Sequence, residues 1–178
     1  AGLTMKNWWL VTWFAMVRGR ANLVMGRVDE SWKALNEALR ICDQYGIREL
    51  LVEIQCVLGD LYRLLDMQDE AIQAYQSALK SEYPGKALLD AKYRLGSLMV
   101  RRGEVERGMR MVEETIAEAK KTGLGLIEIS AEMALGLLYI GQGNEAQALA
   151  NLKKCAEEGD RRGMATLRQS LVLVESQI

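Results

Sequence analysis

The sequence predicts an all-α fold of repeated helical hairpins, from its composition and from a recurring glycine pattern. Of the 178 residues 49% are hydrophobic, and there is one proline, which favours helices. Glycines recur at intervals of 40, 37 and 40 residues, at Gly19, Gly59, Gly96 and Gly136. A helix break follows each by seven residues, at Gly26, Asp66, Gly103 and Gly143. Twelve residues after each glycine comes a small residue: Ser31, Ala71, Gly108 and Ala148. This period indicates that one supersecondary unit is repeated along the chain. No single repeat of this kind can bury its apolar face without its neighbours.

The breaks divide the chain into nine predicted helices in a single domain, 1–178. We expect helices at 5–25, 29–45, 47–65, 68–82, 84–102, 105–122, 124–141, 144–160 and 163–177. Pro84 stands where a first-turn proline is tolerated, and Gly46, Gly123 and Gly163 stand where C-terminal caps are expected. Short connections make neighbouring helices antiparallel. The predicted repeats are 5–46, 47–83, 84–123 and 124–162, followed by a last helix at 163–178.

Within the first helix of each pair, four columns counted from the glycine stay mostly apolar and form a stripe of helical period. Five before the glycine are Phe14, Ile54, Ala91 and Ala131; one before are Arg18, Leu58, Leu95 and Leu135; two after are Ala21, Leu61, Leu98 and Leu138; three after are Asn22, Tyr62, Met99 and Tyr139. The glycine itself permits close approach of the paired second helix, whose own columns are Leu35, Tyr75, Val112 and Leu152, then Ala38, Ala78, Thr115 and Cys155. Four before the glycine, Gln55 and Glu132 are expected to be exposed.

The composition argues against catalysis, a cofactor and a metal site. Histidine is absent, which removes the commonest general base and zinc ligand. The three cysteines, Cys42, Cys56 and Cys155, have no metal-ligand spacing, and free thiols favour a reducing, cytoplasmic location. A net charge of −1 gives nothing that attracts nucleic acid or an anionic membrane. The apolar run 7–17 is too short to span a bilayer, and we interpret it as part of the first helix.

The spaced residues resemble the tetratricopeptide repeat. Leu58-Gly59-x-x-Tyr62 followed by Ala71, Tyr75 and Ala78 carries the resemblance, and Leu135-Gly136-x-x-Tyr139 with Ala148 is similar. The other two repeats depart from the signature, with Arg18 and Asn22, or Met99 and Gly108. The tryptophan usual four residues before the glycine is missing. The period near 40 resembles the repeats of kinesin light chains, spindle-orientation scaffolds and the sensor arm of the maltose-operon activator. The resemblance implies a right-handed superhelical solenoid whose first helices line a concave groove.

We expect a partner-binding groove on the first helices. Its candidate residues are Trp13, Met16, Arg20, Arg63, Tyr93, Arg94, Arg101 and Met133. The lysine and asparagine with which related repeats clamp chaperone tails are absent, so that function is not carried over. The arginines either bind an acidic partner or pair with Glu53, Asp60 and Asp90 and water.

Aromatic residues crowd the first helix at Trp8, Trp9, Trp13 and Phe14. Trp8, Trp9 and Phe14 form a predicted terminal interface. They either anchor a partner, are covered by a further repeat, or support self-association through this helix.

Two functions remain open from the sequence. The first is a non-catalytic scaffold that binds a protein or peptide, amphipathic with acidic residues, in its concave groove. The alternative is a ligand-sensing repeat domain of a multidomain signalling or transcription regulator. Flanking sequence would separate the two, because a nucleotide-binding module or helix-turn-helix favours the sensor and further repeats favour the scaffold.

Overall fold

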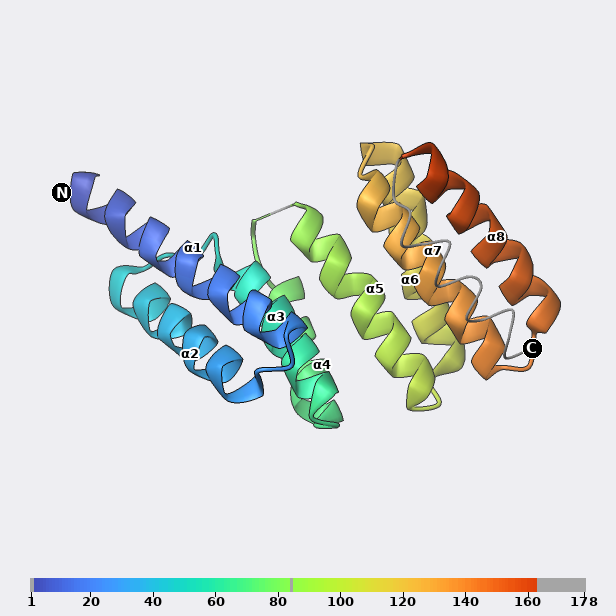
Figure 1. Cartoon of the computed structure of the whole chain (residues 1–178), viewed down its shortest axis with the longest axis horizontal. Helices are drawn as coiled ribbons and strands as arrows, with labels where there is room; N and C mark the ends of the chain where they lie inside the picture. The colour runs from blue at the N-terminus through green and yellow to red at the C-terminus, as the bar shows by residue number, and fades with distance from the viewer. Residues whose placement is uncertain (1, 84, 163–178) are drawn as a thin grey trace. The chain divides into compact units, whose positions relative to one another are not determined.

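A computed structural model describes residues 2–83 and 85–162, which form eight helices and no strand (Figure 1). The all-α prediction is therefore confirmed over this part of the chain. The ninth predicted helix, Pro84 and Gly163 lie outside the described residues. The helices are α1 (Gly2–Val24), α2 (Val28–Tyr45), α3 (Leu51–Leu64), α4 (Gln68–Leu79), α5 (Lys86–Arg101), α6 (Val105–Thr122), α7 (Gly125–Gly141) and α8 (Glu145–Arg161).

The largest boundary difference from the sequence prediction is at α3, which begins at Leu51 rather than at residue 47. Gly46 is left-handed (φ 66°), and the N–H of Ile47 donates to the Cys42 carbonyl at 3.0 Å, which ends α2. The side chains of Ile47 and Leu50 are buried in the core. The short connection is therefore held in a turn by apolar burial and does not extend α3 backwards.

The four predicted breaks share one backbone geometry. Gly26, Gly103 and Gly143 have φ values of 71°, 92° and 74°, and Asp66 has a φ of 58°. After each break, the next N–H donates to the carbonyl five residues earlier: Arg27 to Asn22, Met67 to Tyr62, Glu104 to Met99 and Asn144 to Tyr139, at 2.8–3.0 Å. The positive φ of the break residue turns the chain so that this hydrogen bond to the end of the helix can form. It explains why glycine recurs at three of the four positions.

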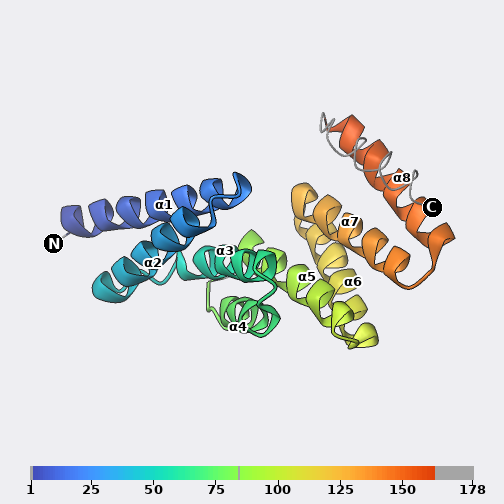
Figure 2. The same ribbon diagram turned by 60° about the horizontal axis from the view of Figure 1, so that its bottom comes forward.

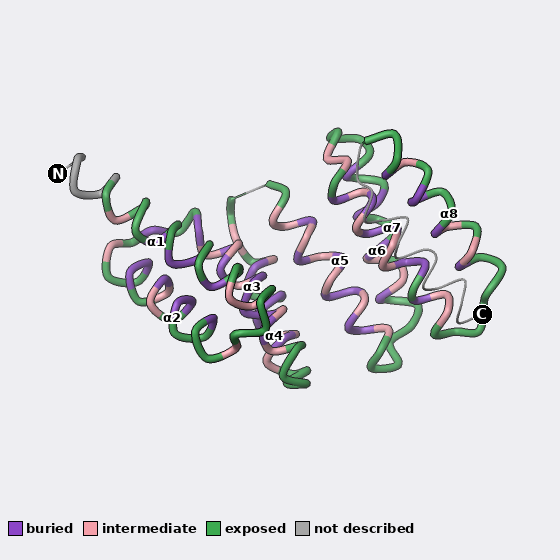
Figure 3. The backbone as a smooth tube through the Cα atoms, in the orientation of Figure 1, coloured by how far each residue is buried: buried purple, intermediate pink, exposed green. Residues whose placement is uncertain are grey.

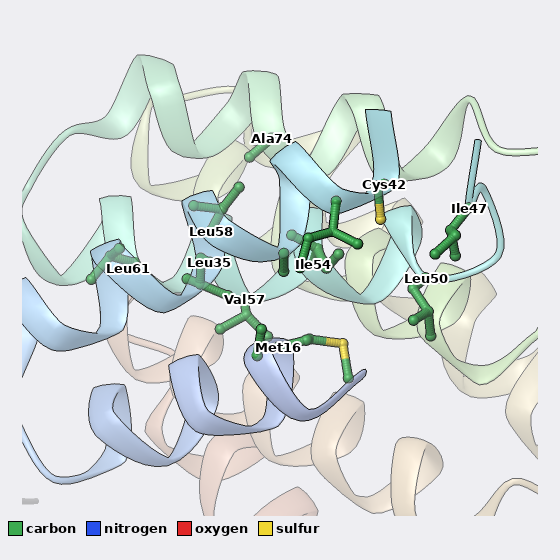
Figure 4. Close-up of a cluster of buried hydrophobic side chains, with 13 residues drawn as sticks. Met16, Leu35, Cys42, Ile47, Leu50, Ile54, Val57, Leu58, Leu61 and Ala74 are labelled. Atoms are coloured by element: carbon green, nitrogen blue, oxygen red, sulfur yellow. The ribbon is translucent and has the colours of Figure 1, made fainter. Parts of the chain in front are cut away.

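The chain divides into two compact units, 1–91 and 92–178, and their boundary falls within α5. In the first unit α1 packs on α2, α3 packs on α4, and α3 also contacts α1 and α2. Thirteen buried residues of these helices and the α2–α3 turn make one apolar cluster (Figure 4). Figure 4 shows Met16 of α1 close to Val57 of α3 in this cluster. The prediction of a single domain over 1–178 stays a prediction.

In the second unit α7 lies between its neighbours in sequence and packs on both α6 and α8. Figure 2 shows α7 and α8 as adjacent helices joined by a short turn. The core of this unit gathers Tyr93 of α5, Val112 and Ile116 of α6, and Ala131, Leu135 and Leu138 of α7.

The glycine columns lie at the contacts between paired helices, as predicted. A Cβ added to Gly19 would lie 2.7 Å from the Leu35 side chain, and one added to Gly136 would lie 2.8 Å from Leu152. A Cβ on Gly59 would meet the Tyr75 ring. Between α5 and α6 the backbones themselves meet, because a Cβ on Gly96 would lie 2.7 Å from the carbonyl oxygen of Gly108. The small residues of the repeat are buried, and Ser31 Oγ donates to the Gly19 carbonyl at 2.8 Å.

The apolar stripe prediction is wrong for α1. Phe14 is 62% exposed, whereas its counterparts Ile54, Ala91 and Ala131 are fully buried. Leu10 and Ala21 are also exposed on this helix. In α3 the same face packs on α2, but among the described residues no helix covers it on α1 (Figure 3). Although α1 is long, no helix among the described residues combines the length and apolar content needed to cross a membrane.

Candidate functional site

The groove residues predicted in the first unit differ in their access to solvent. Trp13 and Arg20 of α1 and Arg63 near the end of α3 are exposed. Met16 is only 2% exposed because it belongs to the apolar cluster of the unit. Trp13 stacks edge-on against Phe14, with ring centroids 5.2 Å apart. In this unit Trp13, Arg20 and Arg63 are thus exposed to solvent, while Met16 supports the fold.

In the second unit the predicted groove residues lie on α5 and α7. Tyr93 is 9% exposed and packs in the core, and the guanidinium carbon of Arg94 lies 5.3 Å from the centroid of its ring. Arg101 is exposed, and Met133 is half-buried on α7. The structure brings Tyr93 and Arg94 together within α5. The remaining groove residues stay individual candidates within their units.

The three aromatic residues of the predicted terminal interface also differ. Trp8 is half-buried and stacks on Tyr45 of α2, with ring centroids 4.3 Å apart and an interplanar angle of 14°. Trp9 and Phe14 are exposed. Trp8 therefore has a packing partner within the chain, and the surface available to another molecule consists of Trp9, Phe14 and their apolar neighbours Leu10 and Val11.

A charge cluster that the sequence analysis missed lies in the second unit. Glu132 of α7 was expected to be exposed, and this expectation is wrong, because only 5% of it is exposed. Its Oε1 accepts hydrogen bonds from Lys120 Nζ of α6 at 2.8 Å and from Lys154 Nζ of α8 at 2.9 Å. Cys155 Sγ lies 3.7 Å from the other carboxylate oxygen. One buried carboxylate thus joins three helices, and the two ammonium groups compensate the cost of burying it.

The protonation of this cluster follows from its surroundings. Burial alone would raise the pKa of Glu132, but the hydrogen bonds from Lys120 and Lys154 outweigh burial, and its pKa lies below the ordinary value of 4.5. A carboxyl group whose pKa is lowered in the folded state contributes its full stabilisation at pH values above its ordinary pKa. This stabilisation is lost as the pH falls through the lowered pKa. Burial is the main cause that raises the pKa of the Cys155 thiol to about 12, and the negative charge of Glu132 is the second cause.

The same two positions carry an inverted ion pair in the preceding repeat. Lys92 stands four residues before Gly96, as Glu132 stands before Gly136. Lys92 Nζ lies 2.8 Å from Glu114 Oε2, and Glu114 is the counterpart of Lys154. The cross-helix pair is thus present in both repeats with its charges exchanged. A search for opposite charges at these two positions of the repeat would have found Glu132.

The cysteines are free and buried at all three positions. Burial, together with Asp43 and Glu49, raises the pKa of the Cys42 thiol to about 11. A raised pKa keeps a thiol protonated and weakly nucleophilic. Among the described residues no three His, Cys, Asp or Glu side chains gather in a way that could hold a metal ion.

Comparison with known proteins relates the hairpins to a family. Residues 15–81, which cover α1 from Ala15 through α4, match the family model described as tetratricopeptide repeat. Residues 15–81 carry tetratricopeptide repeats. No curated protein matches the sequence. A crystal structure of MamA is similar to this chain at 23% identity with a TM-score of 0.56, covering 85% of this chain and 80% of that one. A second crystal structure of MamA protein aligns at 22% identity with a TM-score of 0.47, covering 86% and 94%.

The family match covers the first two tetratricopeptide repeats, and the fold likeness extends over most of the chain. The glycine contact and the break geometry recur in the two later hairpins, α5/α6 and α7/α8, beyond the matched residues. The specific resemblance to kinesin-light-chain, spindle-orientation and maltose-activator repeats stays a prediction.

Proposed function

We propose that this chain is a non-catalytic protein-interaction scaffold. The match of residues 15–81 to the tetratricopeptide repeat is the observation that carries the proposal, because repeats of this family are generally protein-binding modules. The high pKa of the Cys42 and Cys155 thiols supports a role without nucleophilic catalysis. The three free thiols support a reducing, cytoplasmic setting.

The finer proposal is that first-helix side chains bind an amphipathic segment that carries acidic residues. Trp13 offers an exposed aromatic surface, and the exposed guanidinium groups of Arg20, Arg63 and Arg101 can each make bidentate hydrogen bonds to carboxylates. A partner that lacked carboxylates would desolvate these arginines without compensation and would be rejected. Met16 and Tyr93 contribute by fixing α1 and α5, since both side chains are buried.

A displayed library of short random peptides, selected on the whole chain, tests this mechanism. We expect selected peptides to combine acidic and apolar residues. Replacing both Arg63 and Arg101 with alanine should weaken their binding about tenfold or more and flatten its salt dependence. Lys33→Glu on α2 is the control and should leave binding unchanged. Peptides that bind the double arginine variant as tightly as wild type, but lose binding to Lys33→Glu, would overturn the first-helix mechanism.

We further propose that the exposed face of α1 mediates self-association. Leu10 and Phe14 occupy the repeat positions of Leu50, in the turn before α3, and of Ile54 in α3, and both of these residues are buried. The face therefore exposes apolar residues at positions that are buried in the next repeat, and exposed apolar patches of this kind mark interaction surfaces.

Sedimentation velocity tests this proposal with a double variant, Trp9→Glu with Phe14→Lys. The variant should sediment as a smaller species than wild type at the same concentration. Trp8 is left intact because it stacks on Tyr45. Leu126→Glu, at an exposed apolar position of α7, is the control and should sediment like wild type. A wild-type chain that stays monomeric at high concentration would refute self-association.

A further inference from the structure

A groove in the second unit lies between α6 and α8, with α7 as its floor. It has a volume of about 470 Å³ and is built mainly by side chains of the second helices of two successive hairpins. None of the predicted first-helix groove residues lines it. Its lining residues are Glu113, Ile116, Lys120, Glu132, Leu135, Tyr139, Gln147, Ala150, Asn151 and Lys154.

The two ends of this α6–α8 groove differ in charge. Lys120 and Lys154 stand at one end, and Glu113 and Gln147 stand seven residues earlier on the same two helices. At 1.5 Å per residue, the lysine end and the Glu113 end are about 10 Å apart. The groove therefore has a basic end and an acidic end.

The basic end is organised before any ligand arrives. The ammonium groups of Lys120 and Lys154 each donate one hydrogen bond to Glu132 Oε1. The single negative charge of Glu132 compensates one of the two positive charges, and each ammonium group keeps two further N–H donors. The lysine side chains remain 44% and 60% exposed, so their other donors face solvent. Glu128 Oε1 lies 3.9 Å from Lys120 Nζ, and Glu128 Oε2 lies 3.8 Å from Arg162 Nη2. The negative charge of Glu128 is therefore shared between these two cations. Because the buried carboxylate already fixes both lysines, a ligand would lose little side-chain entropy on binding them.

The middle of the groove is apolar. Ile116 and Leu135 are buried beneath it, and Tyr139 and Ala150 line it from α7 and α8. A helix laid between two helices over an apolar floor is a common mode of peptide recognition. A ligand with apolar residues alone would leave the solvent-facing donors at the basic end without a partner.

We propose that the α6–α8 groove binds an amphipathic helix of a partner protein, with a carboxylate over Lys120 and Lys154 and a basic residue near Glu113. Apolar side chains between these two charges pack on Leu135 and Tyr139. The acidic and basic residues of the ligand are about seven residues apart, matching the two ends of the groove. This inference rests on the proposed function only in that the chain binds protein, and it assigns a second surface that shares none of the residues of the first-helix mechanism.

A designed peptide tests the proposal on the whole chain. The probe is a blocked, fluorescein-labelled helical peptide of about 14 residues, with a glutamate and a lysine seven positions apart and leucines between them. Its control peptide has glutamine in place of the glutamate. Binding is measured by fluorescence anisotropy and mapped by amide chemical shifts. We expect shifts on α6 and α8, and binding to the control peptide at least about tenfold weaker.

Two matched variants leave the lysine–glutamate cluster untouched. Ala150→Trp fills the groove and should weaken binding about tenfold or more, whereas Ala117→Trp, on an exposed position of α6 outside the groove, should change it less than about twofold. The double Arg63 and Arg101 alanine variant should bind this peptide like wild type, which separates this site from the first-helix mechanism. No binding at about 1 mM peptide, equal binding by Ala150→Trp, or shifts confined to other helices would each overturn the proposal.

Discussion

The backbone contact between Gly96 of α5 and Gly108 of α6 gives a graded prediction of stability. A Cβ on Gly96 would lie 2.7 Å from the Gly108 carbonyl oxygen and 3.0 Å from Met111 Cβ. A backbone oxygen cannot turn aside as a side-chain end can, so α6 would have to move away. Overpacking of this kind costs up to about 3 kcal/mol, while alanine in place of glycine gains about 1 kcal/mol in helix propensity. Gly96→Ala should therefore destabilise the chain by about 2 kcal/mol.

The same substitution at two other glycines provides the matched series. At Gly136 the new Cβ would lie 2.8 Å from both Cγ and Cδ2 of Leu152, and a side chain can shift where a backbone oxygen cannot, so the cost should be smaller than at Gly96. At Gly141, the last residue of α7, nothing lies within 4 Å, and alanine should stabilise by up to about 1 kcal/mol. From the least to the most stable variant, the predicted order is Gly96→Ala, Gly136→Ala and Gly141→Ala.

Thermal unfolding followed by far-ultraviolet circular dichroism measures this series. For a chain of this size, 1 kcal/mol corresponds to about 2–4 °C in Tm. Gly96→Ala should thus melt about 4–8 °C below wild type, and Gly141→Ala at or slightly above wild type. The leucine variants Gly59→Leu and Gly136→Leu should be less stable than their alanine counterparts, because the added volume meets Tyr75 and Leu152. Equal melting temperatures for Gly96→Ala and Gly141→Ala would refute the assignment of the glycine column to helix contacts.

Three further predictions concern single positions. Asp66→Gly should stabilise the chain by about 0.5–1 kcal/mol in urea unfolding, because Asp66 has a φ of 58° where the other repeats have glycine; a loss of stability would contradict this. Glu132→Gln should cost about 1–3 kcal/mol at neutral pH and reduce the loss of stability that wild type shows as the pH falls below about 4.5; a variant with the wild-type pH profile would show that Glu132 is not the titrating group. The Cys42 and Cys155 thiols should react with a disulfide reagent at pH 8 far more slowly in the native chain than in urea, because burial raises the pKa of both; equal rates would contradict their burial.

The hairpin architecture could be predicted from the sequence because its determinants are local and repeated. Glycine at a helix contact and a left-handed residue at a break are backbone requirements, and Gly136 and Gly143 express them within seven residues. The start of α3 could not be predicted, since the burial of Ile47 and Leu50 depends on helices packed around the turn.

The candidate site was less predictable because neighbouring columns of a helix differ only in what packs against them. Met16 and Tyr93 were assigned to a groove by their column, yet both lie in a core. Phe14 was assigned to a core, yet no described helix covers it. The burial of Glu132 depends on two lysine partners that lie 12 residues before and 22 residues after it in the sequence, on different helices, so the residues around Glu132 do not reveal it.

Site-specific photo-cross-linking tests most directly whether the chain is a scaffold that binds protein through its first helices. A photoreactive amino acid is placed at Arg63 of α3 in one variant and at Lys33 of α2 in another, and each is irradiated with a peptide selected on the whole chain. Both positions are exposed, so both report contact equally well. The proposed function predicts a cross-link from position 63 and none from position 33. A cross-link from position 33 alone, or from neither position, would contradict it.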